Sequence, residues 1–213
     1  QIKQKNQKIR IGFISEFFSN HTIGKLFKGI ILNLSDEKFE KFVFHSHKTD
    51  LSPIHQEFLN AEKKTNIKNI TLSKNFQKSI NEITQENLDI VFFPDIGMSS
   101  EFYYLSFIRF AKIQITSWGH PITTSNDTID YFLSSKILET KDAHKRFSEK
   151  LILSDYLPMY FYKPKIKNIL SEKEIVKKNF YFCSQNLMKI HPHFDEIIGK
   201  ILKKDKKIGR AHV

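Results

Sequence analysis

The chain has 213 residues, of which 40% are hydrophobic and 20 are phenylalanine, so it can bury a core and is not a disordered protein as a whole. Its 34 lysines and arginines exceed its 23 acidic residues by 11, but they form no block of five or more, and we expect no nucleic-acid partner. The absence of about 18 successive apolar residues argues against a membrane partner. A single cysteine, Cys183, excludes an internal disulfide and favours a cytoplasmic location.

Short apolar runs alternate with longer segments of helical spacing. The runs predict strands at 9–15, 39–47, 67–74, 88–97, 112–119 and 130–135. The intervening segments predict helices at 22–34, 53–63, 76–87 and 100–111. Strands that alternate with helices indicate β-α-β units. We therefore expect an α/β fold, with a Rossmann-like, doubly wound parallel sheet over residues 1–165.

The same pattern restarts after a connection rich in lysine at 162–168. A helix is predicted at 171–179, a strand at 179–187 and a helix at 191–205. Because one such step cannot bury its own apolar face, we expect residues 166–207 to be the truncated start of a second domain. The last six residues, IGRAHV, match one reading frame of a common sequencing adapter, and we expect 208–213 to be a non-native tail.

Several familiar motifs are absent from the sequence. It contains no G-x-G pair, no glycine loop followed by G-K-[ST], and no D-x-D, so neither a dinucleotide fingerprint nor a metal-bridged sugar-nucleotide site is indicated. His45 and His47 alternate at a predicted strand end without an obvious carboxylate or cysteine partner. We expect no metal site.

Four polar, turn-rich segments follow predicted strands. They are residues 15–22, 94–100, 119–126 and 184–192. In open parallel sheets, ligands bind at the carboxyl ends of strands, beside helix N-termini that favour anions. The four segments are therefore predicted to form the walls of one cleft.

Each candidate residue in these segments also has a structural interpretation. His21 follows Asn20 and precedes Thr22, so it could serve only the start of a helix. Gly119, His120 and Pro121 could form only a tight turn at a strand exit. Lys189 could be an ordinary solvated lysine. The residues alone leave these alternatives open.

The loops and their neighbouring strands together resemble the catalytic region of the O-GlcNAc transferase family, most closely its bacterial SPINDLY-like branch. The resemblance rests on residues 8–31, 36–45, 88–98, 108–135, 147–162 and 181–195. These segments follow the family's order and spacing. One departure is Lys112, where the family normally has proline.

The resemblance implies a GT-B architecture, in which two Rossmann-like domains face each other across a cleft that holds a sugar nucleotide. It implies an inverting glycosyltransferase that moves N-acetylglucosamine from UDP-GlcNAc to Ser/Thr of acceptor proteins, with no metal and no other cofactor. Relatives use GDP-fucose or attach glucose to asparagine, so GDP-fucose and UDP-glucose remain alternative donors. Family members usually carry tetratricopeptide repeats upstream, and we expect this chain alone, as a fragment, to be inactive.

The resemblance also implies roles for single residues. His21 falls on the family's histidine at the acceptor and sugar cleft, and Gly119, His120 and Pro121 match the loop that faces the donor sugar. Lys189 falls on the lysine at the donor pyrophosphate, where a cation neutralises the leaving group. Gln185 and Asn186 are expected to bind substrate beside it, with Asn186 standing where better-known members carry glutamine. The proton acceptor stays open between His21, a substrate phosphate and a water chain, and a non-catalytic nucleotide-binding or interaction module remains the alternative.

Overall fold

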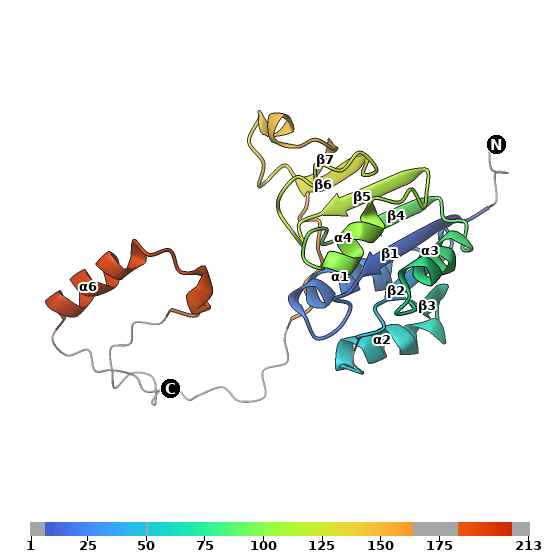
Figure 1. The fold of residues 1–213 in the computed structure, drawn as a ribbon, viewed down its shortest axis with the longest axis horizontal. Coiled ribbons are helices and arrows are strands. Elements are labelled where there is room, and N and C mark those ends of the chain that lie inside the picture. The colour runs from blue at the N-terminus through green and yellow to red at the C-terminus, as the bar shows by residue number, and fades with distance from the viewer. Residues whose placement is uncertain (1–6, 50, 164–182, 206–213) are drawn as a thin grey trace. The chain divides into compact units, whose positions relative to one another are not determined.

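The structure, a computed structural model, describes residues 7–49, 51–163 and 183–205. The chain divides into two compact units, residues 1–163 and residues 164–213 (Figure 1). In the first unit the elements are β1 (Ile9–Ser15), α1 (Thr22–Asn33), β2 (Phe39–His45), α2 (Pro53–Glu62), β3 (Ile67–Thr71), α3 (Phe76–Thr84), β4 (Ile90–Phe93), α4 (Ser100–Ser106), β5 (Ile113–Ser117), β6 (Tyr131–Ser135), the 3-10 helix η1 (Ala143–Arg146) and β7 (Lys150–Ser154). In the second they are the 3-10 helix η2 (Leu187–Lys189) and α6 (Phe194–Lys204).

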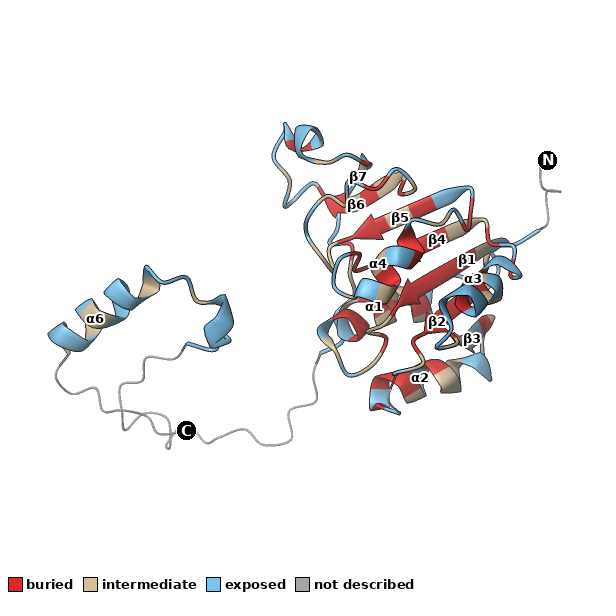
Figure 2. Ribbon diagram, in the orientation of Figure 1, coloured by how far each residue is buried: buried red, intermediate tan, exposed pale blue. Residues whose placement is uncertain are grey.

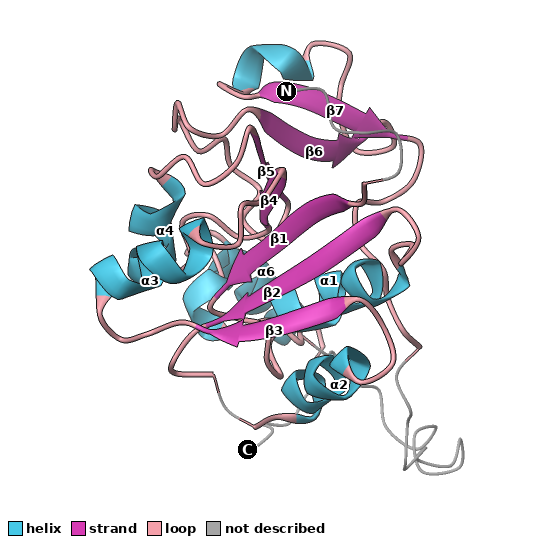
Figure 3. Cartoon of the chain, turned by 90° about the vertical axis from the view of Figure 1, so that its right-hand side faces the viewer, coloured by secondary structure: helices cyan, strands magenta, loops and turns pink. Residues whose placement is uncertain are grey.

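The strands of the first unit form one seven-stranded sheet in the order β3-β2-β1-β4-β5-β6-β7. Every neighbouring pair is parallel. The chain builds outward from β1 to β3 and then returns to the other side of β1 with β4. Helices α1 and α2 cover one face of the sheet, and α3 and α4 cover the other (Figure 3). The predicted α/β fold with a doubly wound parallel sheet is therefore confirmed.

The two faces follow from the alternation of side chains along each strand. On β2, Phe42 and Phe44 belong to the core on the side of α3 and α4, whereas Val43 belongs to the core on the side of α1 and α2. All three side chains are fully buried. The central strands of the sheet are accordingly mostly in the buried class (Figure 2). Successive residues of a strand point to opposite faces, so a continuous apolar run serves both cores. Each such side chain stabilises the fold by about 1.5–3 kcal/mol when it leaves water.

Polar side chains mark the starts of the helices. Ser52 Oγ accepts from the backbone N–H of His55 at 3.4 Å before α2, and Asn75 Oδ1 accepts from that of Lys78 at 3.0 Å before α3. Each cap satisfies a backbone donor that the first helical turn leaves free. Pro53 has no backbone N–H, but it lies in the first turn of α2, where such a group would have no partner within the helix. The proline therefore removes no helical hydrogen bond.

Helices α3 and α4 end three or more residues earlier than predicted, whereas α1 and α2 end one residue earlier. Helix α3 stops at Thr84, and the chain turns through Asn87, whose φ is 47°. Helix α4 stops at Ser106 because the following residues wrap around the side chain of Gln114. Gln114 Oε1 accepts from the backbone N–H of Phe110 at 2.9 Å, and Gln114 Nε2 donates to the carbonyl of Ile108 at 3.2 Å.

The strand β7 was not predicted from the sequence. It pairs with β6 over five residues, with Lys150 opposite Tyr131 and Ser154 opposite Ser135. Ile152 and Leu153 stay 39% and 36% exposed, which is typical of an edge strand. The prediction of six strands was therefore wrong by one.

The segment after β7 returns across α1. The backbone N–H of Tyr160 donates to the carbonyl of Leu26 at 2.9 Å, and a Cβ on Gly29 would lie 2.4 Å from the Tyr160 ring. Asn33 Nδ2 donates to the Tyr162 hydroxyl at 3.0 Å. Glycine at position 29 thus allows a close contact that ties the end of this unit to its first helix.

In the second unit, the predicted helix 171–179, the predicted domain boundary at 165–166 and the tail 208–213 lie outside the described residues. The predicted strand 179–187 is not found in its described part, because Cys183–Asn186 have no strand pairing and Leu187 begins η2. The predicted helix 191–205 is confirmed as α6, which begins three residues later. In the described part of the chain, no helix combines the length and the apolar character that crossing a membrane requires.

Candidate functional site

The candidate site lies at the carboxyl ends of β1, β4 and β5. The strand order reverses between β1 and β4, and connections there leave toward opposite faces of the sheet. Such a switch point is where open α/β sheets bind their ligands. The loops 15–22, 94–100 and 119–126 follow these three strands at the same edge, so three of the four predicted segments lie together. The fourth, 184–192, belongs to the second unit, and its part in one cleft stays a prediction.

Direct contacts join the three loops. Ser15 Oγ donates to Asp95 Oδ2 at 2.9 Å, and the backbone N–H of Gly119 donates to the carbonyl of Pro94 at 2.8 Å. A Cβ on Gly119 would lie 2.3 Å from that carbonyl oxygen and 2.8 Å from Ile23 Cδ1. Only glycine fits at this crossing of the loops.

His21 caps helix α1. Its Nδ1 accepts from the backbone N–H of Ile23 at 3.2 Å, and its ring lies 4.5 Å from the ring of Phe17. Burial and the nearby Lys25 lower the pKa of His21. Because a backbone N–H only donates, the neutral imidazole has its proton on Nε2 while this cap is made. The capping interpretation is thus confirmed, and a functional role for His21 stays a prediction.

His120 lies beside the loop that follows β4. A Cβ on Gly97, which has a φ of +101°, would lie 3.3 Å from His120 Nδ1. His120 is half-buried, and Pro121 after it is exposed. The turn at 119–121 therefore exists as predicted and places His120 at the sheet edge, but its role toward a sugar stays a prediction.

Asp95 is the buried acid of the site. Burial raises its pKa to about 7, the hydrogen bond from Ser15 opposes that rise, and the charge of Glu16 adds to it. The carboxyl group is therefore partly protonated near neutral pH. It lies directly beneath Gly119, since a Cβ on that glycine would be 2.8 Å from Asp95 Cβ.

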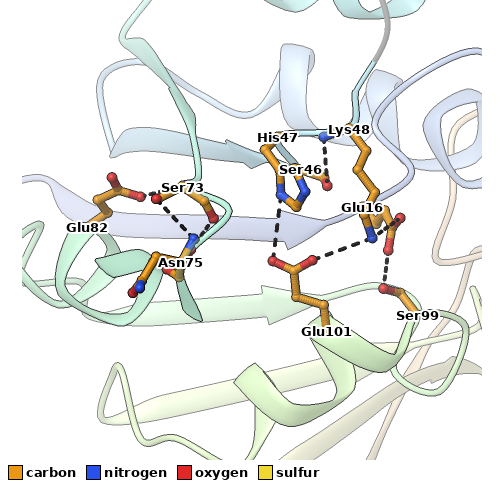
Figure 4. Close-up of polar contacts among 10 residues, drawn as sticks. Glu16, Ser46, His47, Lys48, Ser73, Asn75, Glu82, Ser99 and Glu101 are labelled. Carbon is orange, nitrogen blue, oxygen red and sulfur yellow. Dashed lines mark hydrogen bonds and ion pairs between the residues drawn. The ribbon is translucent and has the colours of Figure 1, made fainter. Parts of the chain in front are cut away.

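A cluster of charged and polar side chains extends the site toward β2 (Figure 4). Lys48 Nζ lies 3.5 Å from Glu16 Oε1 and 3.6 Å from Glu101 Oε2, and Ser99 Oγ donates to Glu16 Oε2. His47 Nδ1 lies 3.9 Å from Glu101 Oε1. This carboxylate was not obvious from the sequence, because it comes from α4, more than 50 residues away along the chain.

The predicted donor-binding residues of the second unit lie around η2. Asn186 Oδ1 accepts from the backbone N–H of Met188 at 3.0 Å and so caps η2, which ends at Lys189. Gln185 Oε1 accepts from the backbone N–H of Asn186 at 3.1 Å. All three predicted residues, Gln185, Asn186 and Lys189, are exposed within this unit.

Sequence reasoning identified the loops but not all of their important side chains. Ser15, Glu16 and Asp95 lay in the predicted walls without being singled out, and Glu101 lay just outside them. An isolated Asp after a proline carries no signal of burial. Only the pairing of β1 with β4, 80 residues apart, brings Ser15 and Asp95 together.

Among residues 7–49, 51–163 and 183–205, no three His, Cys, Asp or Glu side chains gather in a way that could hold a metal ion. A doubly wound sheet with polar loops and a helix N-terminus at its switch point is the architecture of α/β proteins that bind ligands at the sheet edge. Comparison with known sequences narrows this class. The chain belongs to glycosyl transferase family 41, whose model matches residues 1–204.

Two curated relatives are UDP-glucose:protein N-beta-glucosyltransferases of Actinobacillus pleuropneumoniae. The protein of serotype 5b (strain L20) is 29% identical over 129 residues, and that of serotype 7 (strain AP76) is 30% identical over 129 residues. Each match covers 57% of this chain and 20% of the relative. The chain thus spans about a fifth of the length of these proteins.

A solved structure shares the fold. The Thermobaculum terrenum O-GlcNAc transferase mutant K341M superposes with a TM-score of 0.64 over 72% of this chain and 29% of its own, at 13% sequence identity. The likeness confirms the predicted GT-B type of α/β fold.

Proposed function

We propose that these residues belong to an inverting protein O-glycosyltransferase of the SPINDLY-like branch, which moves N-acetylglucosamine from UDP-GlcNAc to Ser/Thr of acceptor proteins in the cytoplasm without a metal. The single observation that carries the proposal is the joining of three loops at the switch point of a family 41 chain. In this proposal the loop at 119–121 faces the donor sugar. Lys189, with Gln185 and Asn186, contacts the nucleotide diphosphate.

The proposed reaction is direct displacement at the anomeric carbon. The acceptor hydroxyl oxygen forms the new bond to that carbon while the bond to the nucleoside diphosphate breaks, and the leaving group departs toward Lys189. The hydroxyl proton goes to a substrate phosphate oxygen or to water. This choice is supported by the cap on α1, which occupies His21 Nδ1 and leaves Nε2–H as a donor. His21 would then donate a hydrogen bond to substrate rather than act as the base.

A second donor is favoured by the curated relatives. Both are named for transfer of glucose from UDP-glucose to protein nitrogen. We therefore keep UDP-glucose, with asparagine as acceptor, as the alternative chemistry at the same site. GDP-fucose completes the set of donors to compare.

The test uses the protein as its gene encodes it. It is incubated with a protein extract and, in turn, UDP-GlcNAc, UDP-glucose or GDP-fucose, with and without EDTA, and the modified residues are mapped by mass spectrometry. We expect N-acetylhexosamine on Ser/Thr with UDP-GlcNAc, unchanged by EDTA. Hexose on asparagine with UDP-glucose alone would replace the proposed donor and acceptor.

A binding measurement separates a transferase from a non-catalytic module. Donor affinity is measured by calorimetry in the same preparation. Binding of UDP-GlcNAc without transfer to any acceptor would overturn the catalytic proposal and leave a nucleotide-binding protein. Absence of both binding and transfer for all three donors would overturn both.

A further inference from the structure

The loop after β5 is held by a carboxylate from a distant segment. Glu149 immediately precedes β7 and is only 5% exposed. Thr123 Oγ1 donates to Glu149 Oε2 at 2.8 Å, and the backbone N–H of Thr124 donates to Glu149 Oε1 at 2.7 Å. Thr124 Oγ1 also donates to Oε1. One buried carboxylate therefore accepts from two consecutive residues of the loop.

These partners of Glu149 are neutral groups: two hydroxyls and one backbone N–H. Burial by itself would raise the pKa of the Glu149 carboxyl group, but the hydrogen bonds from Thr124 and Thr123 lower it below its usual value. The group is thus ionised at neutral pH. Hydrogen bonds to an ionised acceptor are about twice as strong as neutral ones, so they hold the loop firmly.

Ser148 adds a second set of bonds to the same loop. Its backbone N–H donates to Thr123 Oγ1 at 2.9 Å, and its Oγ accepts from the backbone N–H of Ser125 at 3.1 Å. Ser125 has a φ of 51°, in the left-handed region that disfavours a serine. Such a conformation persists where the surroundings impose it.

The ends of the loop are fixed as well. Gly119 is bonded to the carbonyl of Pro94, and the buried Asn126 donates from Nδ2 to Ser106 Oγ at 3.0 Å. His120 and Pro121 therefore lie on a short span between the anchor at Gly119 and the carboxylate of Glu149.

We propose that Glu149 is a positioning residue, which sets the place of the 119–121 turn at the sheet edge from behind through Thr123 and Thr124. The catalytic consequence rests on the proposed function, since it assumes that this turn faces the donor sugar. A displacement of about 1 Å at such a place costs a factor of up to about 100 in rate. The effect of Glu149 on the position of the loop follows from the hydrogen bonds alone.

The experiment compares Glu149→Ala, Glu149→Gln and Thr124→Val with the unaltered protein, all as complete chains. Hydrogen–deuterium exchange is read on peptides that cover residues 118–127, and kcat and KM for the donor are measured. We expect faster exchange of this segment and a fall in kcat/KM of about 10- to 100-fold for Glu149→Ala. Glu149→Gln keeps one acceptor oxygen, so its exchange rate and its kcat/KM should lie between those of Glu149→Ala and of the unaltered protein.

Glu86→Gln is the matched control. Glu86 is also buried, at 7% exposed, but it bonds to Arg10 and Lys68 beyond the other end of β4. We expect it to lower stability without changing exchange at 118–127 or the kinetics. Thr124→Val and Glu149→Gln together should cost less than the sum of their separate effects, because they share one hydrogen bond.

The outcomes separate the two proposals. If exchange at 118–127 rises in the Glu149 variants while neither the unaltered protein nor any variant transfers sugar, Glu149 holds the loop and the proposed function is wrong. If exchange and kinetics in Glu149→Gln and Thr124→Val equal those of Glu86→Gln, the positioning role is overturned. The Gln and Val variants keep the side-chain volume, so this result is obtained even where Glu149→Ala does not fold.

Discussion

Asp95 couples the candidate site to pH because its carboxyl group is buried at the carboxyl ends of β1 and β4. The unfolded chain loses this proton near pH 3.8, whereas the folded chain keeps it until about pH 7. Folding therefore retains a proton that the unfolded chain releases, and the stability that Asp95 contributes is lost as the pH rises through this window. The pH dependence should be visible in a single substitution.

We predict that Asp95→Asn gains stability relative to the wild type as pH rises from 3.8 to about 7. The asparagine carries no charge, so the variant avoids a loss of up to about 1.4 kcal/mol per pH unit. The measurement is urea unfolding at a series of pH values. Asp127→Asn, at an exposed position, controls for the change of net charge. A constant difference between Asp95→Asn and wild type would show that Asp95 titrates normally.

Lys189 tests the role that the family resemblance assigns to it. We predict that Lys189→Ala lowers kcat by about 100-fold and weakens donor binding, because the charge that grows on the leaving diphosphate loses its cation. Lys200→Ala, at another exposed lysine of the same unit, should leave both values unchanged. Steady-state kinetics at varied donor concentration gives kcat and the donor KM for both variants. Wild-type turnover in Lys189→Ala would remove this residue from the mechanism.

At the scale of elements, the crossing of two loops at Gly119 makes a sharp steric demand. We predict that Gly119→Ala destabilises the fold by about 1–3 kcal/mol and impairs the site, because the added Cβ would lie 2.3 Å from a backbone oxygen. Gly199→Ala is the control, since nothing lies within 4 Å of its added Cβ in the middle of α6. That change should stabilise by up to about 1 kcal/mol. Thermal unfolding of both variants compares them, and equal melting temperatures would contradict the steric argument.

The elements also show what the sequence could predict. Strand β1 and helix α1 were predicted to within one residue, because apolar periodicity and the polar residues before Thr22 are local signals. Strand β7 was missed because its short, half-exposed run gains its stability from pairing with β6. The predicted end of α4 was wrong because the Gln114 side chain takes the hydrogen bond of a backbone N–H that a longer helix would use. Long-range hydrogen bonds decide such details, and a single sequence does not display them.

The same limit applies to the candidate site. The loops were predictable, since turn residues after apolar strands are a local pattern. The bond from Ser15 to Asp95 and those from Thr123 and Thr124 to Glu149 depend on strand order. No spacing in the sequence identifies these partners.

At the scale of the whole molecule, the 34 basic residues exceed the 23 acidic ones by 11. Several basic side chains pair with acidic neighbours in different parts of the first unit, among them Lys28 with Glu57, Lys41 with Asp36 and Lys136 with Asp155. These pairs neutralise the cations locally and reduce the field that would attract a polyanion. The expectation of no nucleic-acid partner stays a prediction.

We predict that the protein shows no RNA binding at about 0.15 M salt, where charges farther apart than about 8 Å are screened. Fluorescence anisotropy with a labelled single-stranded RNA measures this binding. Lysozyme, which also carries a net positive charge, is the control for non-specific attraction. Binding that persists at this salt, with a steep dependence on its concentration, would revive an RNA-associated role.

The return of the chain across α1 sets a rule for protein engineering. Tyr160 and Tyr162 are bonded to Leu26 and Asn33, so the last residues of the first unit belong structurally to its first helix. A chimera that joins this unit to the second half of another family 41 protein should therefore place its junction after residue 163. A junction at the end of β7 would leave Gly29 facing solvent and strip α1 of its aromatic cover.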